Sequence, residues 1–303
     1  MKIIITGGAG FIGSNLAGAL LKEGHEIKII DNLISGNIKL KNIEYVKLDI
    51  LEKEKIEKET RGFDAVFHLA ADPRVKESVE SPDSSFKINV LGTFNVLEAC
   101  RKNNIKKFVF TSSSTVYGRA KKIPTPESEP YFPISPYGAS KASCDCYISA
   151  YSDSYGIDCA SLIYANIFGD NSRHGVMYDF YNKLKKNPKK LEILGDGSQK
   201  KSYLYISGCI NATILAFKKT KNYERYNIGS SESHTVNKIA EVMCKVMKLN
   251  PKIEYTGGKI GWIGDVHEFL LDTEKIRKLG WKENVSFEDG IKKYMGWLDK
   301  NLK

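Results

Sequence analysis

The sequence lacks long hydrophobic runs. No apolar stretch in its 303 residues approaches the roughly eighteen residues that a membrane-spanning helix needs. Only Lys2 precedes the first strand-like segment, which leaves no place for the charged and apolar regions of a secretory signal. We therefore expect a cytoplasmic protein with no membrane partner.

Cysteine is scarce and shows no pattern. The six cysteines form no CxxC pair and no spacing typical of zinc ligands. They are Cys100, Cys144, Cys146, Cys159, Cys209 and Cys244. Because they lie in apolar or helical stretches, we expect reduced, buried thiols and no bound metal.

Acidic residues are outnumbered, with 36 Asp and Glu against 46 Lys and Arg, for a net charge of +10. The excess suits an anionic substrate. The basic residues are spread along the chain, and no stacking motif of alternating aromatic and basic residues accompanies them. This distribution favours a lysine-rich, solvated surface over a nucleic-acid site.

The chain also lacks a linker rich in proline, serine or glycine, and no segment repeats. With 42% hydrophobic residues it can bury the core of one large domain or two modest ones. Strand-like and helix-like segments alternate up to about residue 165, with strands predicted at 3–5, 27–30, 46–48, 65–69, 108–111 and 160–163, and helices at 14–23, 86–103 and 137–155. Repeated strand–helix units predict an α/β fold with a doubly wound parallel sheet, the Rossmann arrangement.

After Asn166 the predicted elements become shorter, and strands and helices alternate less regularly. We predict a helix at 176–186, a strand at 191–194, a turn at 195–197 and helices at 210–218 and 236–247. Residues 166–303 are therefore expected to form mainly a smaller C-terminal lobe that binds the substrate. It is interleaved with the 1–165 domain, to which a strand and helix return from about 200–230.

The segment KIIITGGAGFIG at residues 2–13 joins a buried strand directly to Gly7, Gly10 and Gly13. Glycines at this spacing allow a tight turn, close approach of the backbone to a pyrophosphate, and close packing of the following helix. The helix N-terminus then faces the phosphate charge. Glycines that merely turn a chain can give the same pattern. An acidic residue at the end of the second strand would favour the dinucleotide site.

That second strand ends at Asp31, about twenty residues beyond the glycines. A carboxylate at this position accepts both hydroxyls of the adenosine ribose and repels a 2′-phosphate. The sequence therefore predicts NAD as cofactor in preference to NADP, and the 1–165 domain as the NAD-binding one.

Three serines, Ser112 to Ser114, follow the predicted strand at 108–111, and a YxxxK pair, Tyr137 and Lys141, opens a predicted helix. Four residues apart, the tyrosine and lysine share one helix face. A nearby ammonium, with a positively charged nicotinamide, lowers the pKa of a phenol from its usual value of about 10 and makes it a usable base. YxxxK alone also occurs by chance. After a glycine fingerprint it predicts a redox site in which a serine hydroxyl holds the substrate oxygen.

At this point the chain resembles the extended short-chain dehydrogenase/reductases, and within them the NAD-dependent nucleotide-sugar epimerases and dehydratases. The branch that it resembles most is that of the UDP-glucose 4-epimerases. The resemblance covers almost the whole length and rests on TGGAGFIGS (6–14), DNL (31–33), HLAA (68–71), SSSTVYG (112–118), PYGASK (136–141), YAN (164–166), LGDGSQ (194–199), NIGS (227–230) and GDV (264–266).

The resemblance implies a set of cofactor and catalytic residues. Ser113, Tyr137 and Lys141 are implied to be catalytic, with Lys141 also holding the nicotinamide ribose. The other implied cofactor contacts are Gly7, Gly10, Phe11, Ile12, Gly13, Asp31, Asn32, Asp49, Ile50, Leu69, Ala70, Ala71 and Asn89. His68 is expected to be a packed structural histidine, because a base is already present.

The resemblance also implies substrate contacts, beside Ser113 and Tyr137, at Asn166, Arg173, Lys201, Asp265 and Phe269. An aromatic residue at the Phe269 position limits room for an N-acetyl group in the family. The chain departs from the family where arginines usually bind the diphosphate: Lys201 replaces one, and Ile260 and Trp262 flank Gly261 near the other. Lysine attracts phosphate as a point charge but lacks the fork of arginine. Arg173 and Lys259 are candidate substitutes.

The positions after Ser113 hold Ser114 and Thr115, where the 4,6-dehydratases and decarboxylating relatives resemble each other in having acidic residues. The expected activity is therefore 4-epimerisation of UDP-glucose and UDP-galactose through a 4-keto intermediate. UDP-uronates, UDP-N-acetylhexosamines or another sugar-nucleotide oxidoreduction stay open, as does, more remotely, a non-catalytic NAD sensor. The resemblance further implies a homodimer formed through the helices at 86–103 and 137–155.

Overall fold

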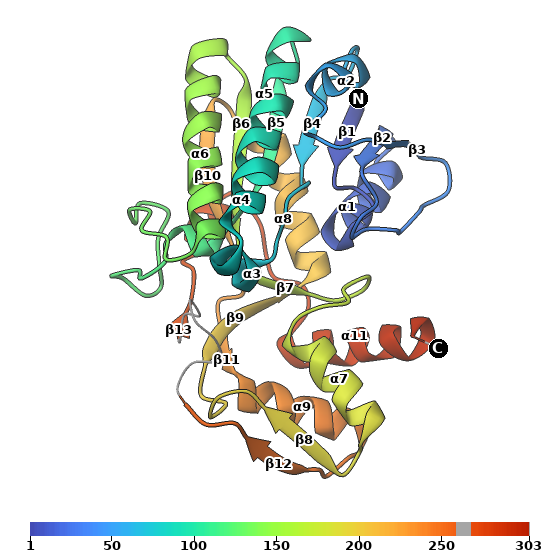
Figure 1. Cartoon of the computed structure of the whole chain (residues 1–303), viewed down its shortest axis with the longest axis vertical. Helices are drawn as coiled ribbons and strands as arrows, with labels where there is room; N and C mark the ends of the chain where they lie inside the picture. The colour runs from blue at the N-terminus through green and yellow to red at the C-terminus, as the bar shows by residue number, and fades with distance from the viewer. Residues whose placement is uncertain (259–267, 303) are drawn as a thin grey trace.

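Seven parallel strands form the large sheet of the molecule (Figure 1). The computed structural model describes residues 1–258 and 268–302. The strand order is β3-β2-β1-β4-β5-β6-β10. Their bounds are β1 (Lys2–Thr6), β2 (Glu26–Asp31), β3 (Glu44–Lys47), β4 (Ala65–His68), β5 (Lys107–Ser113), β6 (Asp158–Tyr164) and β10 (Tyr223–Ile228).

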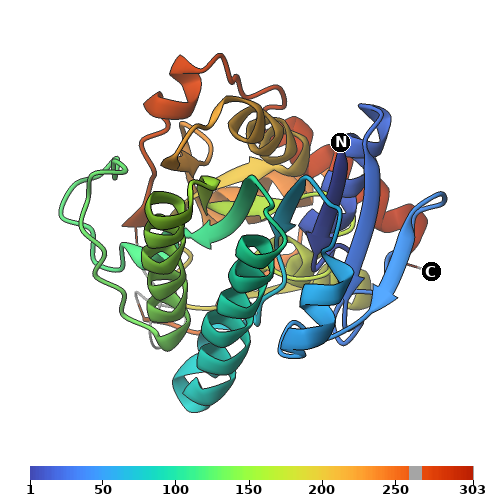
Figure 2. The same cartoon turned by 90° about the horizontal axis from the view of Figure 1, so that it is seen from above.

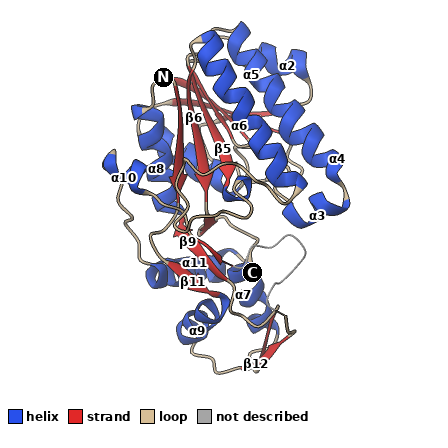
Figure 3. Ribbon diagram, turned by 90° about the vertical axis from the view of Figure 1, so that its left-hand side faces the viewer, coloured by secondary structure: helices blue, strands red, loops and turns tan. Residues whose placement is uncertain are grey.

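Helices cover both faces of this sheet, as Figures 2 and 3 show. One face carries α1 (Phe11–Lys22) and α8 (Ile206–Lys219), and the other carries α2 (Lys53–Glu59), α5 (Gly92–Lys102) and α6 (Pro136–Tyr155). Each face of the sheet buries its own apolar cluster. Successive side chains of a strand point to opposite faces, and helices cover both faces, so two cores form. The predicted doubly wound α/β fold is confirmed.

A smaller lobe lies below the large sheet in Figure 1. Its central strand β9 pairs with β7, β11 and β13, and β8 pairs with β12. These strands are β7 (Asn166–Phe168), β8 (Lys190–Ile193), β9 (Lys200–Tyr205), β11 (Ser233–Thr235), β12 (Lys252–Tyr255) and β13 (Glu268–Phe269). The helices of this lobe are α7 (Val176–Lys186), α9 (Val236–Met247) and α11 (Phe287–Asn301), whereas α10 (Glu274–Lys278) packs against β10 of the large sheet.

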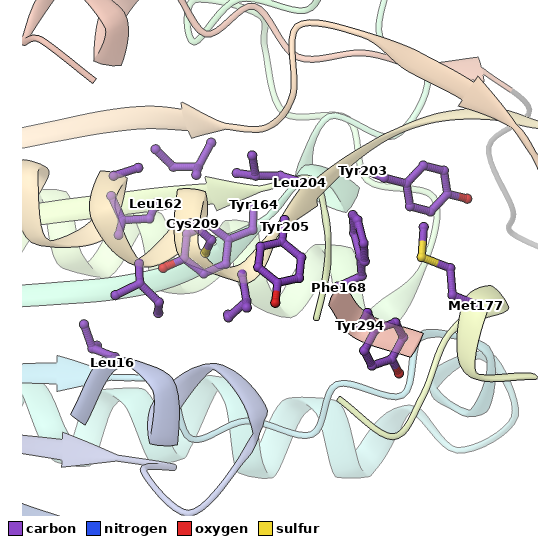
Figure 4. Packing of buried hydrophobic residues seen from close by; sticks show 14 of the residues in the cluster. Leu16, Leu162, Tyr164, Phe168, Met177, Tyr203, Leu204, Tyr205, Cys209 and Tyr294 are labelled. Carbon is purple, nitrogen blue, oxygen red and sulfur yellow. The ribbon is translucent and has the colours of Figure 1, made fainter. Parts of the chain in front are cut away.

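The chain leaves the large sheet after β6, builds part of the lobe, and then returns through α8 and β10. The two parts share a core at their boundary. There the rings of Phe168, Tyr205 and Tyr294 lie side by side (Figure 4), with the Phe168 ring 5.7 Å from that of Tyr205 and 6.3 Å from that of Tyr294. The division of the chain at residues 165 and 166 stays a prediction.

Four short helical segments near the sheet's carboxyl edge complete the described elements. They are α3 (Val75–Glu80), α4 (Pro82–Ser84), the π-helix η1 (Ser85–Leu91) and the 3₁₀-helix η2 (Ser114–Val116). The helix predicted at 86–103 thus consists of a π-helix that continues into α5. Among the helices of the described residues, none has the length and apolar character to cross a membrane.

One expectation about the cysteines is wrong. All six thiols are free, and four are buried, but Cys146 is exposed and Cys244 half-buried. Cys146 follows Cys144 and Asp145 on α6, whose side chains point into the protein, so its own side chain falls on the outer side of the helix.

Candidate active site

The loop between β1 and α1 has no room for side chains. Gly7 has φ +70°, and a Cβ built on it would lie 2.6 Å from the backbone nitrogen of Ala70. A Cβ on Gly13 would lie 2.4 Å from the carbonyl oxygen of Gly7. The N-cap of α1 is Gly10, which has no side chain to occupy the first backbone N–H groups of the helix. This glycine cradle therefore fits a pyrophosphate at a helix N-terminus.

Acidic and amide side chains at the ends of β2 and β3 lie beside this loop. The carboxylate of Asp31 accepts hydrogen bonds from the backbone N–H groups of Ala9, at 3.0 Å, and Leu33, at 2.8 Å. Asn32 donates to Asp49 at 3.0 Å, which links the two strand ends. Asp31 is thereby fixed next to the glycine cradle, where a ribose diol would lie. The carbonyl of Ile50, the neighbour of Asp49, is held by Asn95.

The predicted contact Asn89 is almost fully buried, at 1% exposure, in the π-helix η1. Its side-chain oxygen accepts from the backbone N–H of Asp72, at 2.8 Å, and its nitrogen donates to Ser140 on α6, at 2.9 Å. Asn89 therefore joins the loop after β4, which carries Leu69, Ala70 and Ala71, to the helix that carries Tyr137. Its contact with the cofactor stays a prediction.

The three predicted catalytic residues come from two elements that pack together. Ser113 ends β5, Tyr137 lies in the first turn of α6, and Lys141 follows one turn later. The Lys141 ammonium donates to the carbonyl of Thr111 at 2.8 Å and lies 4.6 Å from the centre of the Phe110 ring. Both groups belong to β5, so the helix is attached to the strand end beside Ser113.

Burial has the largest effect on the pKa values of Tyr137 and Lys141 when the chain is considered without its cofactor. It raises the pKa of Tyr137 to about 12, against an opposing hydrogen bond with Ser113. Burial also lowers the pKa of Lys141. The sequence predicts a lowered phenol pKa. The chain alone has a raised one, because removal from water disfavours the phenolate more than the nearby polar groups favour it.

A cavity of about 710 Å³ opens at the carboxyl edge of the sheet and extends to the small lobe. Nine of the predicted site residues line it: Phe11, Ile12, Leu69, Ala71, Ser113, Tyr137, Lys141, Asn166 and Lys201. Parallel strands place their carboxyl ends at one edge, which is why residues far apart in sequence meet there.

Comparison with known proteins agrees with this geometry. Residues 3–229 match the NAD dependent epimerase/dehydratase family. The chain belongs to this family. It is therefore an enzyme of the nucleotide-sugar epimerase/dehydratase family, and NAD is its cofactor, for which the glycine cradle and Asp31 form the fitting site.

The similarity between this family member and its relatives extends over almost the whole chain. A putative UDP-glucose 4-epimerase of Methanocaldococcus jannaschii is 36% identical, with 99% of each chain covered. The UDP-glucose 4-epimerase of Thermus thermophilus, solved in complex with NAD, is 33% identical with a TM-score of 0.91, covering 99% of this chain and 100% of that one. The UDP-N-acetylglucosamine 4-epimerase of Methanobrevibacter ruminantium, solved with UDP-N-acetylmuramic acid, is 32% identical with a TM-score of 0.91, covering 99% and 98%.

Two predicted substrate residues of this family enzyme are not among the described residues that line the cavity. Arg173 is exposed, next to the lining residue His174. Phe269 is buried in a separate cluster with Val116 and Leu271. Asp265, like the candidate Lys259 and the GDV motif, lies outside the described residues.

The sequence did not predict most of the aromatic residues that line the cavity. They include Tyr164, Phe168, His174, Tyr203 and Tyr294. Tyr164 stands in the YAN motif and could have been found there. The others come from β7, β9, α11 and the loop before α7, whose positions relative to the large sheet no local pattern indicates.

His68 is a packed structural histidine, as predicted. Its ring is fully buried, with Nδ1 2.6 Å from the hydroxyl of Thr6 and Nε2 2.9 Å from that of Thr93. Burial, and secondarily the charge of Lys141, lowers the pKa of His68 to about 3, so the ring is neutral. It braces β4 between β1 and α5.

Proposed function

We propose that this enzyme is an NAD-dependent 4-epimerase that interconverts UDP-glucose and UDP-galactose through a 4-keto intermediate. One observation carries the proposal: Ser113, Tyr137 and Lys141 meet at one cavity, while the positions beside Ser113 hold the hydroxyl residues Ser114 and Thr115. Thr115 donates to the Ser113 hydroxyl at 3.0 Å. The aliphatic hydroxyls of serine and threonine cannot supply the acid and base that elimination across C5 and C6 requires at neutral pH.

In the proposed reaction Tyr137 removes the proton from O4 of the sugar, and Ser113 holds that oxygen. Bound NAD supplies the acceptor and donor of the C4 hydride. Lys141, fixed to the β5 carbonyl, favours the phenolate and holds the nicotinamide ribose. Rotation of the 4-ketose presents its other face, and Tyr137 then returns the proton to O4. The chain contributes orientation and proton transfer.

For the diphosphate we propose Lys201 on β9, with Asn166 on β7 beside it. Both line the cavity, and Asn166 donates to the carbonyl of Ser202 at 3.2 Å, which fixes the two strands together. Arg173 and Asp265 stay proposed contacts. A single lysine provides charge without a bidentate fork, so we expect weaker UDP binding than in relatives with the usual arginines.

UDP-N-acetylhexosamine is a second candidate substrate, favoured by one observation. Phe269, proposed to restrict an N-acetyl group, is buried in a cluster with Val116 and Leu271 and is not among the residues that line the cavity. One relative of similar identity is a UDP-N-acetylglucosamine 4-epimerase. UDP-uronates stay a further alternative, because a UDP-glucuronate 4-epimerase of Thermodesulfobacterium geofontis is 29% identical over 99% of this chain.

The deciding experiment offers the purified protein UDP-glucose, UDP-galactose, both UDP-N-acetylhexosamines and UDP-glucuronate, and identifies the products by NMR. We expect galacto/gluco interconversion with no accumulation of reduced cofactor. Accumulated reduced cofactor would instead indicate a dehydrogenase, and binding of NAD with no turnover of any sugar would indicate a sensor.

Tyr137→Phe tests the catalytic assignment. We expect turnover to fall roughly 10³-fold with NAD still bound, because only the acid/base hydroxyl is removed. Tyr155→Phe is the matched control, since Tyr155 is an exposed tyrosine at the other end of the same helix. Near-normal activity in Tyr137→Phe would refute the mechanism.

A further inference from the structure

A buried carboxylate lies directly behind the catalytic residues. Asp145 is on α6, one turn after Lys141, and only 1% of it is exposed. Its Oδ2 accepts hydrogen bonds from the hydroxyl of Ser112, at 2.7 Å, and from that of Tyr131, at 2.9 Å. Its Oδ1 accepts from the hydroxyl of Ser161. Its two oxygens thus accept three hydrogen bonds, which an ionised carboxylate can do because it only accepts.

The partners of Asp145 connect the two halves of the active site. Ser112 is the residue before Ser113 on β5, and Ser161 lies on the adjacent strand β6, opposite Phe110. The carboxylate therefore attaches the helix that carries Tyr137 to the strand end that carries Ser113. The nearby bond from Lys141 to the Thr111 carbonyl acts between the same two elements.

Asp145 also acts on Lys141 through charge. Residues four apart share a helix face, so the carboxylate lies near the ammonium. Burial lowers the pKa of Lys141, and negative charge on Cys144 or Asp145 opposes this. Burial raises the pKa of the Cys144 thiol to about 11, so that thiol is uncharged at neutral pH. Negative charge on Asp145 therefore favours the protonated form of Lys141.

The other groups facing Asp145 do not change charge near neutral pH. They come from η2 and the following turn, from the loop before α6 and from β10, and they are Tyr117, Tyr131, Tyr223 and Arg225. Burial raises the pKa of each of the three phenols. The Arg225 guanidinium lies 4.9 Å from the centre of the Tyr131 ring and stays cationic. Burial raises the pKa of Asp145 itself, while its three hydrogen bonds and Lys141 oppose that change.

We propose that Asp145 is a positioning residue for the reaction at Tyr137, holding the Ser113 strand end in register with α6 and placing its carboxylate on the same helix face as Lys141. This inference rests on the proposed 4-epimerase function. It assigns two separable effects to one side chain: register through Ser112, and charge through Lys141.

The test compares Asp145→Asn with Asp153→Asn, which makes the same charge change at an exposed position of the same helix. For Asp145→Asn we expect kcat to fall about tenfold or more at neutral pH with KM changed less than about twofold. We also expect the alkaline limb of the kcat profile to move to lower pH by about one unit, because Lys141 loses its proton more readily without the anion. Asp153→Asn should match the wild type.

Ser112→Ala separates the two effects and provides a second variant should Asp145→Asn fail to fold. It removes the bond to the β5 strand end but leaves the charge, so kcat should fall while the alkaline limb stays in place. An unchanged kcat in Ser112→Ala overturns the register role. An unchanged alkaline limb in folded Asp145→Asn overturns the charge role.

A readout without substrate keeps the two proposals distinguishable. The NMR shift of the Lys141 Cε carbon, assigned with Lys141→Met, reports its titration in the NAD complex. We expect the Lys141 midpoint to lie lower in Asp145→Asn than in the wild type. If the wild type turns over no UDP-sugar, the proposed function fails, but the Lys141 titration still decides the effect of Asp145.

Discussion

At the scale of single residues, Gly13 shows how little space the cofactor loop leaves. A methyl group there would meet the Gly7 carbonyl oxygen at 2.4 Å and the Gly8 Cα at 2.7 Å, both rigid backbone atoms. We expect Gly13→Ala to destabilise the protein by about 1–3 kcal/mol through overpacking and to weaken NAD binding, because the turn must shift. Urea unfolding and NAD titration measure the two effects.

Gly18, five residues later on the same helix, is the control. A methyl group at Gly18 would only touch Leu40, at an ordinary distance of 3.6 Å. Gly18→Ala should leave NAD binding unchanged and be neutral or stabilising by up to about 1 kcal/mol, since alanine favours the helix. Equal behaviour of the two variants would contradict the steric account of the cradle.

At the scale of elements, the start of α6 matters because Tyr137 lies in its first turn. The Ser135 hydroxyl caps this helix by accepting from the backbone N–H of Gly138 at 3.1 Å. We expect Ser135→Ala to cost about 1 kcal/mol of stability and also to lower kcat several-fold, as the first turn frays. Denaturant unfolding and steady-state kinetics measure the two quantities.

Ser286 is a matched control, because it is the N-cap of α11, a helix that carries no predicted catalytic residue. Its hydroxyl accepts from the backbone N–H of Asp289 at 3.2 Å at the start of α11. Ser286→Ala should lose a similar amount of stability, about 1 kcal/mol, and keep kcat. If both variants lose kcat equally, general loosening rather than placement of Tyr137 explains the result.

Sequence predicted those elements whose pattern is local. The helices at 176–186 and 236–247 have the bounds of α7 and α9, because apolar spacing marks their buried faces. The glycine cradle, Asp31 and the Tyr137–Lys141 pair were predicted because their spacing carries their chemistry, and Ser113 was predicted from the family resemblance. The π-helix η1 and the role of Asp145 were not, since both depend on contacts between segments that are distant in sequence.

Phe269 shows what a sequence pattern cannot predict, namely the direction in which a side chain points. The family resemblance predicts a contact of Phe269 with the sugar, and that contact stays a prediction, because β13 pairs with β9 and Phe269 is buried beside Val116 and Leu271. Motifs fix which residues follow one another. The side of a two-residue strand that faces a cavity depends on tertiary packing.

At the scale of the whole molecule, we propose a homodimer formed through η1, α5 and α6. Large apolar side chains on η1 and α6 are 44% to 64% exposed: Phe86, Leu91, Tyr147 and Tyr155. Burying such a surface between two copies removes it from water. We expect a dimer in sedimentation velocity, and dissociation on Tyr147→Glu, which places a charge in the interface.

Phe132→Glu is the control for that experiment, because Phe132 is 68% exposed but lies in the loop before α6. It should remain dimeric. A wild-type monomer at micromolar concentration would contradict the proposal.

The return of the chain through β10 has a consequence for biosynthesis. Strand β6 has its outer hydrogen-bonding edge covered by β10, yet residues 165–222 are synthesised between the two. A nascent chain that ends before β10 exposes an unpaired parallel strand, which is a template for association with other chains. Part of the small lobe is thus inserted between two neighbouring strands of the large sheet and the rest follows β10, so the lobe is not one contiguous module of the chain.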